Sequence, residues 1–516
     1  MKVVTVEQMR ALERRAVESG IEEDALMETA GLGVARYVAQ LLDGIRGKRV
    51  VVLVGPGNNG GDGMVAARYL ADWGALITLY MTSARRRDDK FEDCRARRVR
   101  VVEASEDPEQ WQLGSYLALT DVVIDAVLGI GSDRPLEAEL RRLMASIQDL
   151  RRESKHAKLI AIDLPTGVDA DTGACDDACF PADVTLTLGA PKVGLFRFPG
   201  AACVGRLETV PIGLPEDAAD DVSLELADAS MVRRLLPPRP IAAHKGTFGH
   251  VAVVAGSRRL VGASVLAAAS AYRAGAGLVT LAAPDTADRI AAPALLEQVH
   301  LPLAETEDGH VAAEAAGAVR ALFGRASAAV VGPGLGDAES VRSFLGALLL
   351  TEPGLSIPLV IDADGLNALA QTYDWPEKLS AAAVLTPHPG EMSRLLGRPI
   401  AEVEDDRVAT AREAAARWRQ VVVLKGAHTV VAAPDGRAAL SPFANPALAT
   451  AGTGDVLSGI VGSLLAQGAA PYDAAVAGVY VHAAAGEAIR EEIGDAGLLA
   501  SDLLSRVPVV LKELRA

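Results

Sequence analysis

The chain has few aromatic residues, and this scarcity indicates what its core is made of. Only 4% of its 516 residues are Phe, Trp or Tyr, although 50% are hydrophobic. The apolar half is therefore mainly aliphatic, with alanine and valine abundant. Such a composition is typical of helices packed on buried parallel strands, which read as aliphatic runs. We therefore predict an α/β protein.

The chain also lacks an excess of basic residues and a long apolar run. Its formal net charge of −16 disfavours nucleic acid or an acidic membrane as partner, because nothing overall attracts a polyanion. No apolar stretch approaches the roughly 20 residues that span a bilayer, and Arg273 interrupts the closest candidate. The charged opening turns, with Glu7, Arg10 and Glu13, do not resemble a signal peptide. We expect a soluble, cytoplasmic protein.

Cysteines are scarce as well. The four are Cys94, Cys175, Cys179 and Cys203, and their spacing shows no zinc-like pairing. Cys175 and Cys179 share an acidic loop, ACDDAC, where a metal clip is an alternative. Reduced cytosolic thiols are the preferred interpretation.

A chain of this length predicts two or three domains. Two series of β-branched runs alternate with helical stretches, which predicts parallel sheets covered on both faces. The region around Gly213–Asp228 turns acidic and loses periodicity, and LLPPRP follows at 235–240. We therefore assign residues 1–213 and 242–514 to two domains and residues 214–241 to a linker.

Polar loops follow the first series of strands. GPGNNGGDG at 55–63 comes between the strand Arg49–Val54 and a helix predicted over Met64–Asp72, a geometry that cradles phosphate. Ligands of parallel sheets gather where the strands end. Oxygens of Asn59, Asp125 and Thr166, each in a separate loop of this kind, would ring a hard cation. The alternative is that the acidic residues only cap their turns.

These residues resemble the NAD(P)H-hydrate epimerase family over residues 1–213. TVEQMRALERRA, LMETAG, GPGNNGGDG, DAVLGIG and DLPTG match its pattern in order. The resemblance implies a Rossmann-like three-layer αβα domain, potassium bound by Asn59, Asp125 and Thr166, and Asp163 as the proton-handling group at the nicotinamide end. It also implies that the hydrated nucleotide contacts two segments: Asn58, Asn59, Gly60, Gly61 and Asp62, and Gly129, Ile130, Gly131, Ser132, Asp133, Arg134 and Pro135.

This first resemblance has two departures. Thr166 stands where the family usually has serine, which keeps the hydroxyl. Ile130 stands where threonine is common, so that loop contact differs from the family's. Related domains elsewhere lack the activity and act as scaffolds in RNA metabolism.

The stretch AGTGDVLSG at 451–459 carries the strongest chemistry in the second half. Apolar residues at helical spacing follow it, so we predict that a helix begins there: Val456, Leu457, Ile460, Val461, Leu464 and Leu465. Free N–H groups at a helix N-terminus attract anions, and Asp455 lies beside them. Such a site can steady a phosphoryl group and deprotonate a hydroxyl. The alternative is an ordinary helix cap.

Residues 242–514 resemble the ADP- or ATP-dependent NAD(P)H-hydrate dehydratases, which have a ribokinase-like α/β fold. The motifs are HKGTFGHVAVVAGS, GASVLAAASAYRAGAGLVT, GPGLG, DADGLN, LTPHPGEMSRLLG, VVLKGAHTVV and NPALATAGTGDVLSG. One departure is Ala447–Leu448 in place of Gly-Met.

The second resemblance implies roles for particular residues. Asp455 is the base, and Gly452, Thr453 and Gly454 offer N–H groups to the transferred phosphoryl. Ala263, Gly336 and His388 lie on the substrate side. The adenine nucleotide, ADP or ATP with a magnesium ion, contacts Lys425, Gly426, Ala427, His428, Thr429 and Gly454.

Together the two halves predict a repair enzyme for hydrated NADH and NADPH. The first domain would interconvert the R and S hydrates, and the second would phosphorylate the S hydrate so that phosphate leaves. One alternative is a sugar or vitamin kinase with a non-catalytic first domain; another is a first domain that serves only as an oligomerisation or RNA-binding scaffold. The choice between ADP and ATP stays open, and alanine-rich helices suggest a homo-oligomer.

Overall fold

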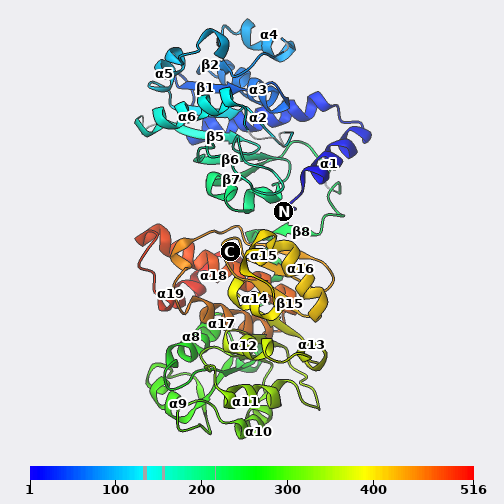
Figure 1. The fold of residues 1–516 in the computed structure, drawn as a ribbon, viewed down its shortest axis with the longest axis vertical. Helices are drawn as coiled ribbons and strands as arrows, with labels where there is room; N and C mark the ends of the chain where they lie inside the picture. Colours follow the sequence, from blue (N-terminus) through cyan, green and yellow to red (C-terminus); the bar gives the residue numbers. More distant parts are fainter. Residues whose placement is uncertain (86, 132–135, 154–156, 216) are drawn as a thin grey trace. The chain divides into compact units, whose positions relative to one another are not determined.

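The computed structural model describes residues 1–85, 87–131, 136–153, 157–215 and 217–516. The chain divides into two compact units, Met1–Val222 and Ser223–Ala516. Each unit is an α/β structure with helices on both sides of its sheet (Figure 1). In the described part of the chain, no helix has both the length and the apolar content needed to cross a bilayer.

The first unit is built on a seven-stranded sheet in the order β3-β2-β1-β4-β5-β6-β7, and all its pairings are parallel. Its strands are β1 Arg49–Val54, β2 Leu76–Met81, β3 Arg100–Glu103, β4 Val122–Ala126, β5 Lys158–Ile162, β6 Val184–Leu188 and β7 Arg206–Val210. Its helices are α1 Val6–Glu18, α2 Glu23–Leu41, α3 Asn58–Asp72, α4 Asp89–Ala96, α5 Trp111–Leu117 and α6 Ala138–Glu153.

Strand β1 shows why this unit has three layers. Every residue of β1 after Arg49 is buried. Val50, Val52 and Val54 belong to the apolar cluster that includes α2 and α3, whereas Val51 and Leu53 belong to the cluster that includes α5 and α6. Because successive side chains of a strand point to opposite faces, an unbroken aliphatic strand requires a helical layer on each face. This confirms the predicted three-layer arrangement.

Helix α3 begins earlier than the sequence predicts. It starts at Asn58, inside GPGNNGGDG, rather than at Met64. Glycine disfavours helix, but a Cβ on Gly60 would lie 2.2 Å from the Gly55 carbonyl oxygen, and one on Gly63 2.5 Å from the Cβ of Ala126. The glycines let the first turns of α3 pack closely against the sheet, so tertiary packing overrides propensity here.

The second unit has a ten-stranded sheet in the order β11-β10-β9-β12-β13-β14-β15-β16-β17-β8. Only the pairings of β16 with β15 and with β17 are antiparallel among these described strands. The strands are β8 Leu224–Leu226, β9 His250–Val254, β10 Leu278–Pro284, β11 Val299–Leu303, β12 Ala328–Val331, β13 Leu359–Ile361, β14 Ala383–Leu385, β15 Val421–Leu424, β16 Val430–Ala432 and β17 Ala438–Leu440.

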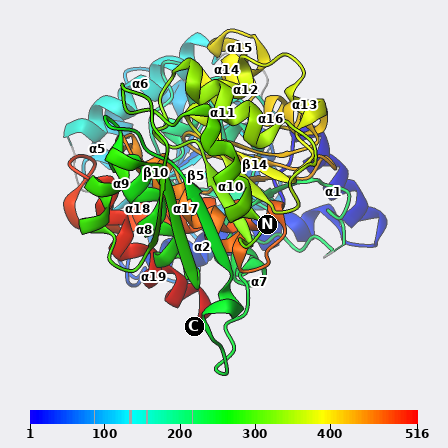
Figure 2. The same cartoon turned by 90° about the horizontal axis from the view of Figure 1, so that it is seen from below.

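Helices cover both faces of the second sheet (Figure 2). On one face, a single apolar cluster joins the sheet to α7 Ala229–Leu235, α8 Val261–Arg273, α9 Asp285–Ala291, α17 Thr453–Ala466, α18 Pro471–Ile493 and α19 Ala500–Arg515. The remaining helices are α10 Ala316–Phe323, α11 Glu339–Leu349, α12 Asp364–Ala370, α13 Trp375–Lys378, α14 Pro389–Leu396, α15 Ile400–Asp405 and α16 Arg407–Trp418. The predicted apolar face of α17 is buried, as expected.

The junction between the units differs from the predicted linker, residues 214–241. The second unit already begins at Ser223. β8 pairs with β17, and Val232 of α7 is fully buried in the second unit's core. The acidic, proline-rich composition hid these two short elements, because a three-residue edge strand and a seven-residue helix carry little periodicity.

Candidate active sites

The first unit contains a cavity of about 1240 Å³ where strands β1, β4 and β5 end. It exceeds the roughly 300–1,000 Å³ of pockets for drug-sized ligands, so a dinucleotide is within its capacity. Its lining includes most of the predicted contacts: Asn58, Asn59, Asp62, Gly129, Ile130, Gly131 and Asp163. Gly60 and Gly61 lie in the buried first turns of α3. Ser132, Asp133, Arg134 and Pro135 lie outside the described residues.

Asp163 stands at the end of β5 with a positive φ of 69°, held by a buried lysine. Its Oδ1 accepts hydrogen bonds from Lys192 Nζ and, at 3.1 Å, from the Leu188 backbone N–H. Lys192 Nζ also donates to the Leu188 carbonyl oxygen at 2.9 Å. Oδ2 lies 3.7 Å from where a Cβ on Gly129 would stand. One carboxylate oxygen is thus fixed by the fold, and the other lies near the cavity-lining Gly129.

Other carboxyl groups line the same cavity, and two of them, Asp62 and Glu13, interact with both Asp163 and Lys192. Burial raises the pKa of Asp62 well above its ordinary value, and the charges of Asp163 and Glu13 raise it further. Burial also raises the pKa of Glu13, which the Lys192 charge opposes. The Lys192 charge therefore acts on Asp62 and Glu13 from a distance, whereas its Nζ forms an ion pair with Asp163. The raised pKa of Asp62 and of Glu13 shifts each group toward the protonated form, in which a carboxyl group can donate a hydrogen bond.

Asn59, Asp125 and Thr166, the predicted cation ligands, are connected by hydrogen bonds through the Leu128 backbone. Thr166 donates through Oγ1 to Asp125 Oδ1 at 2.7 Å and through its backbone N–H to Oδ2 at 2.9 Å. Asn59 Nδ2 donates to the Leu128 carbonyl oxygen at 2.9 Å. Asn59 Oδ1 is buried and accepts no hydrogen bond from the described residues. An orphaned amide oxygen, connected through the Leu128 backbone to Thr166 and the buried Asp125 carboxylate, offers the type of oxygen donors that a hard cation takes.

In the second unit, AGTGDVLSG forms a turn that leads into α17. Gly452 is in the left-handed region, with φ of 91°, and no described side chain caps the helix. Thr453 instead donates through Oγ1 to the Leu448 and Thr450 carbonyl oxygens, both at 3.0 Å. The helix N-terminus therefore keeps free N–H groups for an anion. The cap interpretation does not apply.

Asp455 lies in the first turn of α17 among other acids. Burial, followed by the charge of Asp362, raises the pKa of Asp455 to about 7; Lys425 opposes this, while Asp364 and Glu391 add to it. A carboxyl group with this pKa exchanges a proton near neutral pH, which suits a general base.

Lys425, which lies in the same site, is bound to Asp362 and not to Asp455. Lys425 Nζ donates to Asp362 Oδ1 at 2.7 Å and lies 3.8 Å from Glu391 Oε2. Ser458 donates to Asp362 Oδ2 at 2.5 Å. Asp362 is thus satisfied on both oxygens, and Asp455 is left without a direct cationic partner among the described residues.

His388, Gly336 and Ala263, the predicted substrate side, lie on three loops or helix ends. His388 caps α14: its Nδ1 accepts from the Gly390 backbone N–H at 3.0 Å, and its own N–H donates to Glu391 Oε2 at 2.8 Å. Gly336 donates its N–H to Asp364 Oδ2 at 2.7 Å. Ala263 lies in the first turn of α8, where a Cβ on Gly334 would be 2.8 Å from it.

Residues 425–429, the predicted nucleotide segment, form the connection between β15 and β16. Gly426 and Ala427 are exposed. His428 has φ of 49°, and its Nδ1 lies 3.1 Å from the Ser441 carbonyl oxygen. Thr429 Oγ1 donates to the Gly426 carbonyl oxygen at 2.8 Å. Gly426 and Thr429 thus hold the loop in its conformation, and Ala427 at its tip is exposed to solvent.

Sequence reasoning missed several residues of these sites. In the first unit they are Lys192 and Glu13; in the second they are Asp362, Glu391 and His482. His482 is half-buried; desolvation lowers its pKa to about 4, and its Nε2 lies 2.9 Å from the Thr453 carbonyl oxygen. Asp362 and Glu391 were visible inside DADGLN and TPHPGE, whereas Lys192 and His482 follow no comparable motif.

Comparison with known proteins matches both units. Residues 23–194 match a family described as YjeF-related protein N-terminus, and residues 251–509 match one described as NAD(P)H-hydrate dehydratase. An ADP/ATP-dependent NAD(P)H-hydrate dehydratase from Bacillus subtilis, solved with ATP and Mg²⁺, is 33% identical and covers 56% of this chain and 98% of its own, with a TM-score of 0.48.

Two relatives extend over the whole chain. The bifunctional NAD(P)H-hydrate repair enzyme Nnr of Moorella thermoacetica is 37% identical and that of Thermofilum pendens 39%; each alignment covers 100% of this chain and 97% of the relative. With both units matched in order by a single enzyme family, the chain belongs to the bifunctional NAD(P)H-hydrate repair enzymes.

Proposed function

We propose that the two activities of the family are divided between the cavity of the first unit and the acidic site around Asp455 in the second. The first unit inverts the hydroxyl-bearing carbon of hydrated NADH or NADPH, with Asp163 as its proton-handling group. The second unit uses ADP or ATP to remove the hydroxyl of the S hydrate, with Asp455 as base.

Inversion requires the hydroxyl to leave one face of the ring and return to the other, and each event moves a proton. Asp163 suits this task because Lys192 fixes Oδ1, while Oδ2 lies close to Gly129 at the cavity wall. The pKa values of Asp62 and Glu13 are raised, so these groups can donate hydrogen bonds to the substrate's amide or ribose oxygens. The glycine-rich start of α3 would face the nucleotide phosphates.

A potassium ion fits between Asn59, Asp125 and Thr166. Its support is the orphaned Asn59 Oδ1 and the buried Asp125 carboxylate. When bound, the ion would offset the Asp125 charge and hold the Thr166 turn, which follows Asp163 by three residues. Its test is replacement of K⁺ by a bulky organic cation, which should slow recovery of the R hydrate and leave that of the S hydrate unchanged.

In the second unit, Asp455 would take the proton of the S hydrate's hydroxyl as its oxygen attacks the terminal phosphoryl group. The backbone N–H of Gly454, in the first turn of α17, would face the charge on the phosphoryl oxygens, a donor type worth roughly 3–4 kcal/mol at comparable sites. The C–O bond then breaks, inorganic phosphate leaves, and loss of a ring proton restores the dihydronicotinamide. ADP would end as AMP, or ATP as ADP.

Magnesium would accompany the nucleotide and neutralise phosphate charge. The carboxylates Asp362, Asp364 and Glu391, whose charges act on Asp455, supply the oxygen donors that Mg²⁺ prefers. Three acids against one lysine leave an acidic site, which favours a divalent cation over a bare polyphosphate.

The observation that carries this proposal is the pKa of about 7 for an Asp455 placed at an uncapped helix N-terminus. To test it, the full chain is mixed with R and S hydrates of NADH plus ADP or ATP, and dihydronicotinamide absorbance is followed. We expect full recovery, with one phosphate released per dihydronicotinamide. No recovery with either nucleotide, or a phosphorylated substrate that persists, would contradict it; the second outcome is that of a simple kinase.

A further inference from the structure

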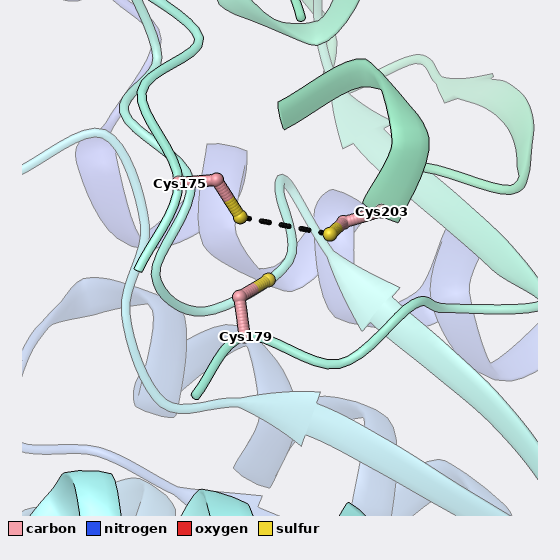
Figure 3. Close-up of side chains that lie close together, drawn as sticks. All are labelled: Cys175, Cys179 and Cys203. Atoms are coloured by element: carbon pink, nitrogen blue, oxygen red, sulfur yellow. Dashed lines mark hydrogen bonds between the residues drawn. The ribbon is translucent and has the colours of Figure 1, made fainter. Parts of the chain in front are cut away.

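Three cysteines of the first unit converge at a place that neither proposed activity uses. Figure 3 shows the side chains of Cys175, Cys179 and Cys203 directed toward one another. Their Sγ atoms all lie within 4.8 Å of one another, and those of Cys175 and Cys203 are 3.6 Å apart. In the described part of the chain, no other group of three or more His, Cys, Asp or Glu side chains comes together in this way.

These distances suit a shared cation. Zinc–thiolate bonds of roughly 2.3 Å place the sulfurs of a tetrahedral site about 3.8 Å apart. A disulfide needs a sulfur–sulfur separation of about 2.05 Å, and none of the four cysteines is bonded. Only small side-chain adjustments therefore separate the present arrangement from a three-thiolate site.

We infer that Cys175, Cys179 and Cys203 bind a thiophilic d¹⁰ cation, Zn²⁺ in the first place, through three thiolates. Cys179 and Cys203 are buried, while Cys175 is half-buried, so water can complete the coordination from its side. Thiolates select soft or borderline cations over K⁺ or Mg²⁺. The site is therefore chemically distinct from the oxygen-lined group at Asn59.

The three cysteines connect two segments of the first unit near the turn that carries Asp163 and Thr166. Cys175 and Cys179 belong to the connection between β5 and β6, and Cys203 ends the 3₁₀ helix η3, Gly200–Cys203. Cys175 bridges to Val168, and the Asp176 N–H donates to the Gly167 carbonyl oxygen at 2.9 Å. A bound cation would hold the β5–β6 connection and the end of η3 together. Because Cys175 pairs with Val168, this would also restrain the turn that carries Asp163 and Thr166. The cysteines act here as positioning residues.

Metal binding is measured on the reduced, chelator-treated full chain, titrated with Zn²⁺ against a chromophoric chelator and with Cd²⁺ while thiolate charge-transfer absorbance is followed. We expect one equivalent of either ion. Bound Zn²⁺ should protect three of the four cysteines from a thiol reagent and raise the melting temperature of the first unit.

The controls use the chain's own cysteines. Cys94→Ser removes a buried thiol outside the cluster and should leave binding unchanged. Cys175→Ser, the least buried of the three, should weaken binding more than about 100-fold, since even an outer partner of a metal ligand is worth 10–100-fold. A triple variant with serine at positions 175, 179 and 203 should bind neither Zn²⁺ nor Cd²⁺ stoichiometrically.

Several results would overturn the inference. One is binding by wild type no tighter than by the triple variant, and another is an air-formed Cys175–Cys203 disulfide in a chain that binds no Zn²⁺ when reduced. If the triple variant does not fold, thiol protection in the wild-type chain decides the question alone. The site is excluded if Zn²⁺ changes the reactivity of none of the four thiols.

Discussion

The two units differ in which acid the lysine of the site binds. In the first, Lys192 bonds directly to Asp163, the proposed reacting group. In the second, Lys425 bonds to Asp362, and Asp455 stands one step away with a pKa of about 7. The lysine of the first unit fixes the proposed reacting acid directly, whereas the lysine of the second unit binds a neighbouring acid and leaves Asp455 with its raised pKa. The choice of partner thus sets the chemistry.

The largest effect expected from this comparison is that of Asp455→Asn. Loss of a general base costs about 10²–10⁴ in rate, so repair of pure S hydrate should fall by that factor. R-to-S conversion, followed by chromatography, should be unchanged. Asp163→Asn is the matched variant, and it should show the reverse pattern; equal losses in both assays would break the division between the units.

The second prediction concerns Lys192→Met. It leaves Asp163 buried without its cation, and removing one partner of a buried ion pair costs about 3–5 kcal/mol. Denaturant unfolding of the first unit should show this loss, along with loss of epimerisation. Lys158→Met, at the exposed start of β5, is the control and should change stability little. A loss below about 1 kcal/mol would mean that the pair does not hold the Asp163 turn.

The third prediction is a pH profile. Asp455 acts as base only when ionised, so single-turnover dehydration should rise about tenfold per pH unit below 7 and level off above it. Asp362→Asn removes the charge that raises the pKa of Asp455 and frees Lys425 to oppose it, so the midpoint should move to lower pH by about 1 unit or more. Asp435→Asn, an exposed acid of the same unit, should leave it in place. An upward shift would contradict the charge arrangement.

The smallest expected effect concerns His388. His388 caps α14, so His388→Ala should lower the free energy of unfolding by about 0.5–2 kcal/mol. His388→Asn should keep most of that free energy, because asparagine is a strong N-cap. Thermal unfolding distinguishes the two variants. If His388→Asn keeps stability but raises KM for the hydrate, His388 also contacts substrate; an unchanged KM would restrict it to capping.

The sequence predicted those parts of the molecule that local pattern controls. The aliphatic run Arg49–Val54 identified strand β1 to the residue, and DLPTG and AGTGD marked two sites because their turns need particular residues in a row. Short strands such as β16 and β17, three residues each, carry too little pattern to predict.

Contacts between distant segments escaped prediction. Lys192 lies 29 residues after Asp163, and nothing near it in sequence indicates that it is buried against that acid. Cys203 lies 28 residues after Cys175, which is why ACDDAC alone did not indicate a third thiol. The start of α3 was missed for the opposite reason: local propensity argued against helix, and close packing against Gly55 and Ala126 required glycine.

The proposed reacting groups of the two activities, Asp163 in the first unit and Asp455 in the second, lie on one chain. A single chain therefore always supplies the two activities in equal number, whatever the level of expression. Neither can be scarce relative to the other, so any imbalance between consumption of R and S hydrates must come from their rate constants and not from the amounts of enzyme. The covalent connection of the two units at residues 222 and 223 thus fixes the molar ratio of the two activities at one to one.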